Sequence, residues 1–112
     1  MSSTFNDYQV QAKTTFAVDG GLNTKVYYLT LGLVGEAGEV AEKIKKIIRN
    51  HGGDLAQLDR DDIKRELGDV QWYLAMLADT LGLSLDDIAR TNLAKLADRH
   101  DRDVIKSTGD YR

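Results

Sequence analysis

Two long segments of the sequence space their apolar residues at the period of an α-helix rather than at the alternating period of a β-strand. Between residues 25 and 50 the members of this stripe are Leu29, Leu33, Ala37, Val40, Ile44 and Ile47. Between residues 61 and 81 they are Ile63, Leu67, Val70, Leu74, Leu77 and Leu81. A helix with one apolar face must bury that face against another element, so the pattern predicts two amphipathic helices that pack together.

Glycine clusters divide the rest of the chain into further helical segments, and no proline interrupts them. A first helix is expected over residues 5–16, followed by a loop over residues 17–24. The predicted stops after the second and third helices are residues 51–53 and Gly82, and Ser84 opens a fourth helix that runs to about Asp101. The chain therefore predicts an all-α fold, a four-helix bundle of two helical hairpins, as one domain over residues 1–112.

Charge and composition exclude several kinds of protein. A net charge of −3 disfavours binding of duplex nucleic acid through its phosphates, and the lack of cysteine excludes disulfides and zinc–thiolate sites. No segment approaches the roughly 18 apolar residues of a transmembrane helix, and no signal-peptide pattern is present, so we expect a cytoplasmic protein without a membrane partner. A chain of 112 residues buries a modest share of its surface, which favours a homo-oligomer, a dimer or a tetramer.

Each long helix carries a pair of acidic residues three positions apart. At about 100° per residue, Glu36 and Glu39 lie about 60° and 120° to one side of the apolar stripe. Glu66 and Asp69 take the same angles on the third helix, so packing the two helices brings four carboxylates together. Clustered carboxylates are the ligands that Mg²⁺ prefers. The alternative is that the acids are solvated and form ordinary helix pairs, such as Glu39 with Lys43.

Glycines inside the two long helices favour the first interpretation. They are Gly32, Gly35, Gly38 and Gly68. Each costs roughly 0.5–1 kcal/mol relative to alanine, a cost that indicates close approach of another helix or of a ligand.

A di-iron carboxylate bundle is excluded by the sequence. Such a bundle needs Glu-x-x-His pairs, whereas the residues three positions before His51 and His100 are Ile48 and Ala97. We therefore expect His51 at a helix end and His100 on the surface.

Residues 33–39 and 64–70 resemble the E-x-x-E and E-x-x-D motifs of the MazG-like all-α nucleoside triphosphate pyrophosphohydrolases. The resemblance extends to Tyr8-Gln9, to residues 92–99 and to residues 109–112. It implies hydrolysis of a nucleoside triphosphate, often a deoxynucleotide, to the monophosphate and pyrophosphate, with Mg²⁺ or alternatively Mn²⁺ as the cofactor. The metal ligands and catalytic residues that it implies are Glu36, Glu39, Glu66 and Asp69.

One departure from the family motif leaves a second function open. Many members have two adjacent acids at the start of the first motif, where this chain has Gly35 before Glu36. The number of metal ions and the general base are therefore undetermined. The alternative is a catalytically weak nucleotide-binding or helical interaction module with the same fold.

Further residues are candidates for binding the rest of the nucleotide. Asn92 is expected on the inward side of the fourth helix, with Lys95 and Arg99 beside it, and both cations suit phosphate oxygens, as the resemblance also suggests. A structural asparagine and surface cations are the alternatives. Lys43 lies between the directions of Glu36 and Glu39, so it either pairs with an acid or reaches a phosphate.

Aromatic and amide side chains are the candidates for contact with the base. Trp72, Tyr27 and Tyr28 can stack on a base, although such residues more often fill a core or a subunit interface. Gln9 is a candidate for reading a base edge. The sequence leaves the base, the sugar and the physiological role open.

Overall fold

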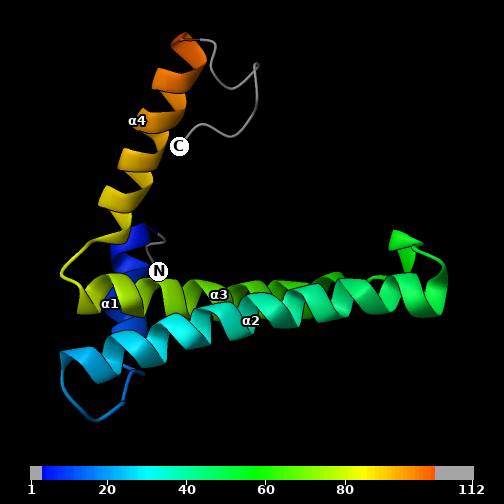
Figure 1. The fold of residues 1–112 in the computed structure, drawn as a ribbon, viewed down its shortest axis with the longest axis horizontal. Coiled ribbons are helices and arrows are strands. Elements are labelled where there is room, and N and C mark those ends of the chain that lie inside the picture. Colours follow the sequence, from blue (N-terminus) through cyan, green and yellow to red (C-terminus); the bar gives the residue numbers. More distant parts are fainter. Residues whose placement is uncertain (1–3, 103–112) are drawn as a thin grey trace.

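A computed structural model describes residues 4–102, which contain four α-helices, one short 3-10 helix and no strand (Figure 1). The elements are α1 (Phe5–Lys13), α2 (Leu22–His51), η1 (Leu55–Gln57), α3 (Arg60–Thr80) and α4 (Leu85–Asp101). The predicted all-α class is confirmed. Residues 109–112, which contribute to the family resemblance, lie outside the described residues.

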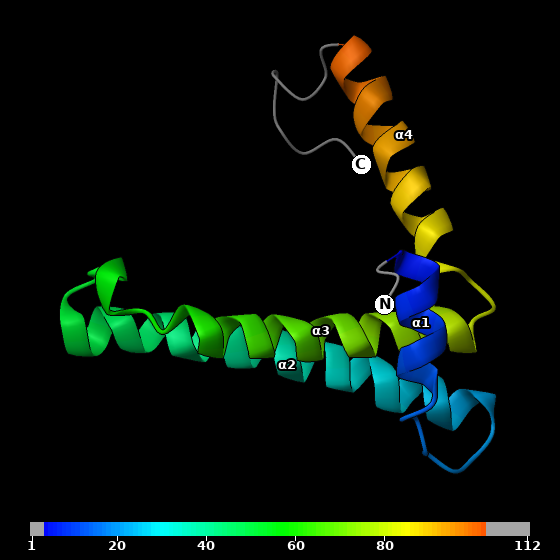
Figure 2. The same ribbon diagram turned by 180° about the vertical axis from the view of Figure 1, so that it is seen from behind.

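The long helices α2 and α3 form an antiparallel hairpin whose two members lie side by side along most of their length (Figures 1 and 2). Helix α1 crosses this hairpin where α2 begins and α3 ends, and it contacts α3 and the start of α4. From there α4 points away from the hairpin. The predicted hairpin of the second and third helices is present, but the four-helix bundle is not confirmed, because α4 does not lie along α2 and α3.

Local hydrogen bonds end the first helix at Lys13, three residues earlier than expected. The hydroxyls of Thr14 and Thr15 donate to the carbonyls of Gln11 and Ala12, each at 2.7 Å. Short hydroxyl side chains at a helix end compete for backbone carbonyls in this way and favour termination.

The predicted stops and the predicted cap of the later helices are confirmed. Gly52 follows α2 with a φ of 60°, and Gly82 follows α3 with a φ of 73°, conformations that glycine adopts without strain. The Ser84 hydroxyl accepts a hydrogen bond of 3.0 Å from the Asp87 amide at the start of α4. Helix α2 begins at Leu22, three residues before the expected start.

The hydrophobic core lies where α1 crosses the hairpin. Its buried members are Ala12, Leu29, Ala75, Met76, Ala78 and Leu85. Rings close this core on one side: Phe16 meets Trp72 edge to face, with 5.8 Å between ring centroids. The indole N–H of Trp72 donates to the Thr15 hydroxyl at 2.8 Å, which ties α3 to the end of α1. Among residues 4–102, no helix combines the length and apolar character that crossing a membrane requires.

Gln9 joins α1 to both neighbouring helices. It is buried, and its amide nitrogen donates to the carbonyls of Ala75 at 3.3 Å and Leu83 at 3.0 Å. Its amide oxygen accepts from the backbone N–H of Leu85 at 3.0 Å. Because both amide hydrogens bind backbone carbonyls, the structure gives Gln9 a structural role in place of the predicted contact with a base edge.

We predict that Gln9→Ala lowers the free energy of unfolding by about 2–4 kcal/mol, because three backbone groups at the junction lose their partner. Urea denaturation followed by circular dichroism measures this loss. The matched control is Asn6→Ala, since the exposed Asn6 makes one such bond, with the Asp86 amide. The control is expected to cost less than about 1 kcal/mol, and equal losses in the two variants would contradict the assignment.

Candidate functional site

The antiparallel register of α2 and α3 places four residues of each helix opposite one another along one side of the hairpin, which we call the acidic face. On α2 they are Gly32, Glu36, Glu39 and Lys43, and on α3, in reverse order, they are Tyr73, Asp69, Glu66 and Asp62. Both sets have the spacing that keeps side chains on one helix face. Contacts at both ends support this register: Lys43 hydrogen-bonds to Asp62, and Gly32 lies directly against the ring of Tyr73.

Three of the four predicted metal ligands meet in the middle of this face. One carboxylate oxygen from each of Glu36, Glu66 and Asp69 lies within 4.8 Å of the other two. Glu36 and Glu66 are half-buried, whereas Asp69 is exposed. Glu39 is exposed and lies outside this group, so its role as a ligand stays a prediction.

The electrostatics of the cluster favour a bound cation. Partial burial raises the pKa of Glu36, and the negative charges of Asp69, Glu66 and Glu39 raise it further. A raised pKa means that the folded chain disfavours the ionised carboxylate at this position. A divalent cation with a preference for oxygen ligands relieves that repulsion, so the donor set fits Mg²⁺.

Lys43 pairs with acids of α3, which is the first of its two predicted roles. Its ammonium group hydrogen-bonds to the Asp62 carboxylate and lies 3.8 Å from an oxygen of Glu66. The hydrogen bond raises the pKa of Lys43 and lowers the pKa of Asp62. The pair therefore places a fixed positive charge beside Glu66, and Asp62 is a residue that the sequence analysis missed.

An aromatic hollow of about 340 Å³ lies beside the carboxylates and is lined by Glu36, Asp69, Trp72 and Tyr73. Tyr73 meets Trp72 edge to face, with 4.9 Å between ring centroids, and lies 6.3 Å from the ring of Tyr28. A hydrogen bond with Tyr28 raises the pKa of Tyr73. The hollow thus places acidic oxygens, which suit a hard metal ion, next to flat aromatic rings.

Of the predicted stacking residues, Trp72 lines this hollow, and it also packs on the core. Its two predicted roles, stacking on a base and filling a core, are therefore both compatible with the structure. Tyr28 contacts Tyr73, and Tyr27 is exposed and does not line the hollow. Tyr73 was not among the site residues predicted from the sequence. Its helical angle of about −80°, between those of Glu66 and Asp69, is the signal that identifies it.

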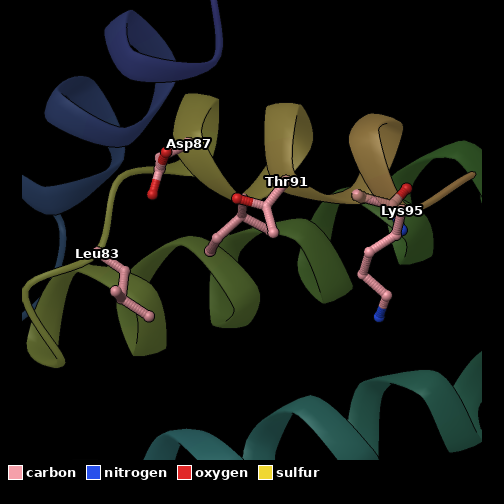
Figure 3. A pocket seen from close by; sticks show the side chains of 6 residues that line it. Leu83, Asp87, Thr91 and Lys95 are labelled. Carbon is pink, nitrogen blue, oxygen red and sulfur yellow. The ribbon is translucent and has the colours of Figure 1, made fainter. Parts of the chain in front are cut away.

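The candidates on α4 lie elsewhere. Asn92 and Lys95 line a separate hollow of about 360 Å³, together with Leu83, Asp87, Ile88 and Thr91, and Figure 3 shows several of these residues along one side of α4. Asn92 is exposed rather than inward-facing as predicted, because α4 points away from the hairpin. Lys95 is exposed and Arg99 is buried, and neither lines the carboxylate hollow. Their contact with phosphate stays a prediction.

Known proteins resemble this chain over the residues that form the acidic face. A gene 37 protein of Mycobacterium phage L5 is 46% identical over 109 residues, which cover 94% of this chain and 96% of that protein. No solved structure matches the chain. The sequence profile of the MazG nucleotide pyrophosphohydrolase domain matches residues 25–104, a range that contains every residue of the acidic face. The chain therefore belongs to the MazG nucleotide pyrophosphohydrolase domain family.

Proposed function

We propose that the protein hydrolyses a nucleoside triphosphate, most simply a deoxynucleotide, to the nucleoside monophosphate and pyrophosphate. The observation that carries the proposal is the convergence of Glu36, Glu66 and Asp69 beside an aromatic hollow. In the reaction, a water oxygen forms a bond to the α-phosphorus as the bond from that phosphorus to the bridging oxygen breaks, and pyrophosphate leaves. Such a reaction suits the clearance of unwanted nucleotides from the cellular pool.

Mg²⁺ is the proposed cofactor, with Mn²⁺ as the alternative, because the donor set consists of carboxylate oxygens. Glu36, Glu66 and Asp69 would hold the ion, and Glu39 is the neighbouring acid on the same face. When bound, the ion supplies positive charge that offsets the charge of the phosphates during attack. The chain itself provides the rest: Lys43, which pairs with Asp62, also lies 3.8 Å from Glu66 and offsets part of its charge, and the rings of the hollow offer a surface for the nucleoside.

A substrate panel tests the activity. Purified protein with Mg²⁺ is expected to convert at least one deoxynucleoside or ribonucleoside triphosphate to its monophosphate and pyrophosphate, separated by ion-exchange chromatography. Release of single phosphates would contradict the proposal. Nucleotide binding without turnover would also contradict it and would instead indicate the catalytically weak binding module, for which Gly35 is the motivating feature.

Substitution of the clustered acids tests the residue assignment. Glu36→Gln and Asp69→Asn are each expected to lower kcat at least about 100-fold, because each removes an oxygen donor, while the helical circular dichroism is retained. The matched control is Glu42→Gln on the same helix, whose carboxylate pairs with Lys45 on the surface. A folded Glu36→Gln or Asp69→Asn enzyme with activity near that of the control would remove the residue from the site.

The raised pKa of Glu36 predicts a pH-dependent effect on stability. The folded chain binds this proton more tightly than the unfolded chain, whose pKa is near 4.5, so the group favours folding at low pH and loses that contribution as the pH rises through the folded pKa. Without metal, Glu36→Gln should therefore gain thermal stability relative to wild type as the pH rises above about 4.5 toward neutral. Thermal unfolding in EDTA measures this difference.

Two comparisons accompany that experiment. Added Mg²⁺ should stabilise the wild-type chain more than Glu36→Gln, because the variant lacks one ligand. Glu42→Gln should show no gain, since its pairing with Lys45 lowers rather than raises the carboxyl pKa. If Glu36→Gln gained nothing at neutral pH, the assumed carboxylate repulsion would be wrong.

We also propose that the protein is a homo-oligomer. Its accessible surface is 8083 Å², whereas a folded monomer of 12.5 kDa is expected to expose about 6,200 Å². Its radius of gyration is 17.2 Å, against about 13 Å for a compact domain of this length. Large apolar side chains are exposed on the hairpin: Leu31, Val34, Ile48 and Leu67. A second copy of the chain is the simplest cover for this surface.

Light scattering of the purified protein should therefore give two or four times the chain mass of 12.5 kDa. Replacing Leu31, which is 73% exposed, by glutamate should reduce that mass by placing a charge in the interface. Circular dichroism serves as the control for folding. A monomeric wild-type protein at micromolar concentration would refute the assembly.

A further inference from the structure

Gly32 lies inside α2, one turn before Glu36, where glycine costs roughly 1 kcal/mol relative to alanine. A Cβ atom at this position would overlap Cε1 of Tyr73 and would lie 2.5 Å from Cδ1 and 2.6 Å from Cζ of the same ring. Carbon atoms without a bond between them do not approach so closely. Any side chain at residue 32 must therefore displace the Tyr73 ring or separate α2 from α3.

The other glycines inside the two long helices do not share this contact. A Cβ atom at Gly35, Gly38 or Gly68 meets nothing within 4 Å beyond its chain neighbours and the nearby backbone of its own helix. The predicted close approach of a neighbouring helix is therefore observed at Gly32 alone among these four positions. The side chain that makes the approach is Tyr73, a residue that lines the carboxylate hollow.

The ring of Tyr73 has little freedom to retreat. Trp72 stands edge-on against it at 4.9 Å, and Tyr28 lies 6.3 Å away on α2. The buried residues of the core pack on its inner side. The ring also borders the open hollow beside Glu36 and Asp69, so displacement toward that side would place it in the space that a substrate would occupy.

We propose that Gly32 is a positioning residue of the nucleotide site. Because it has no side chain, Gly32 leaves room for the Tyr73 ring against α2. The ring then lines the hollow and does not enter it. The ring offers a flat, partly polar surface to the nucleoside part of a nucleotide whose phosphates lie at the carboxylates. This inference rests on the proposed function and adds to it a residue with no polar group of its own.

The first experiment compares Gly32→Ala with Gly35→Ala, the same change one turn along α2 in open space. Gly32→Ala should raise KM for the nucleotide at least about tenfold with kcat changed less than about threefold, because the carboxylates stay in place. It should also shift the fluorescence of Trp72, the single tryptophan of the chain, which contacts Tyr73. Gly35→Ala should leave the fluorescence of Trp72 unchanged, because a methyl group there meets no neighbouring side chain.

A double-variant cycle shows whether Gly32 acts through Tyr73. Tyr73→Ala should itself raise KM, and adding Gly32→Ala to it should have no further effect on KM or on Trp72 fluorescence. Independent, multiplying effects would overturn the inference. If Gly32→Ala alone failed to fold, the double variant would restore folding, because the ring that clashes is absent.

These results are distinguishable from failure of the proposed function. A wild-type protein that hydrolyses no nucleotide would refute the function, whereas the fluorescence of Gly32→Ala would still report the displacement of Tyr73. An active wild type with unchanged KM and unchanged fluorescence in Gly32→Ala would overturn the role of Gly32 and leave the activity standing.

Discussion

The register of α2 against α3 is the constraint on which the site depends. The pairing of Lys43 with Asp62 fixes one end of the acidic face. The packing of the Tyr73 ring against Gly32 fixes the other end. Between these contacts the carboxylates come within 4.8 Å of one another, although their charges repel. A slip of one helical turn would break both end contacts and separate the acids, so the contacts that fix the register also oppose that repulsion.

The crossing helix α1 supports this arrangement from outside the hairpin. Trp72 connects α1 to the site. Its ring packs on Phe16 and its N–H donates to the Thr15 hydroxyl, and it also lines the carboxylate hollow. Gln9, in the middle of α1, joins that helix to α3 and to the start of α4. The hollow is therefore built on the most buried part of the molecule, which suits a site whose rings must keep their positions.

Helical spacing in the sequence was sufficient for the all-α class, the α2–α3 hairpin, the glycine stops and the shared side of the acid pairs, because these features are local in the chain. The direction of α4 was not predictable in this way. It depends on α1 and on bonds from Gln9 to residues more than 60 positions away. Asn92 was placed inward for the same reason, since its helical angle was correct only for a helix packed along the hairpin. The helical angle of Tyr73 places it on the side of the acids, but its contact with Gly32 could not be predicted, because that contact exists only in the folded register.

The most direct test of the account is anomalous diffraction from crystals that contain Mn²⁺, which accepts the same oxygen ligands as Mg²⁺. A metal site at this cluster should give a peak between Glu36, Glu66 and Asp69, with carboxylate oxygens about 2.0–2.3 Å from the ion. A peak at other residues, or none at this cluster in fully loaded crystals, would contradict the claim that the α2–α3 register builds a metal site.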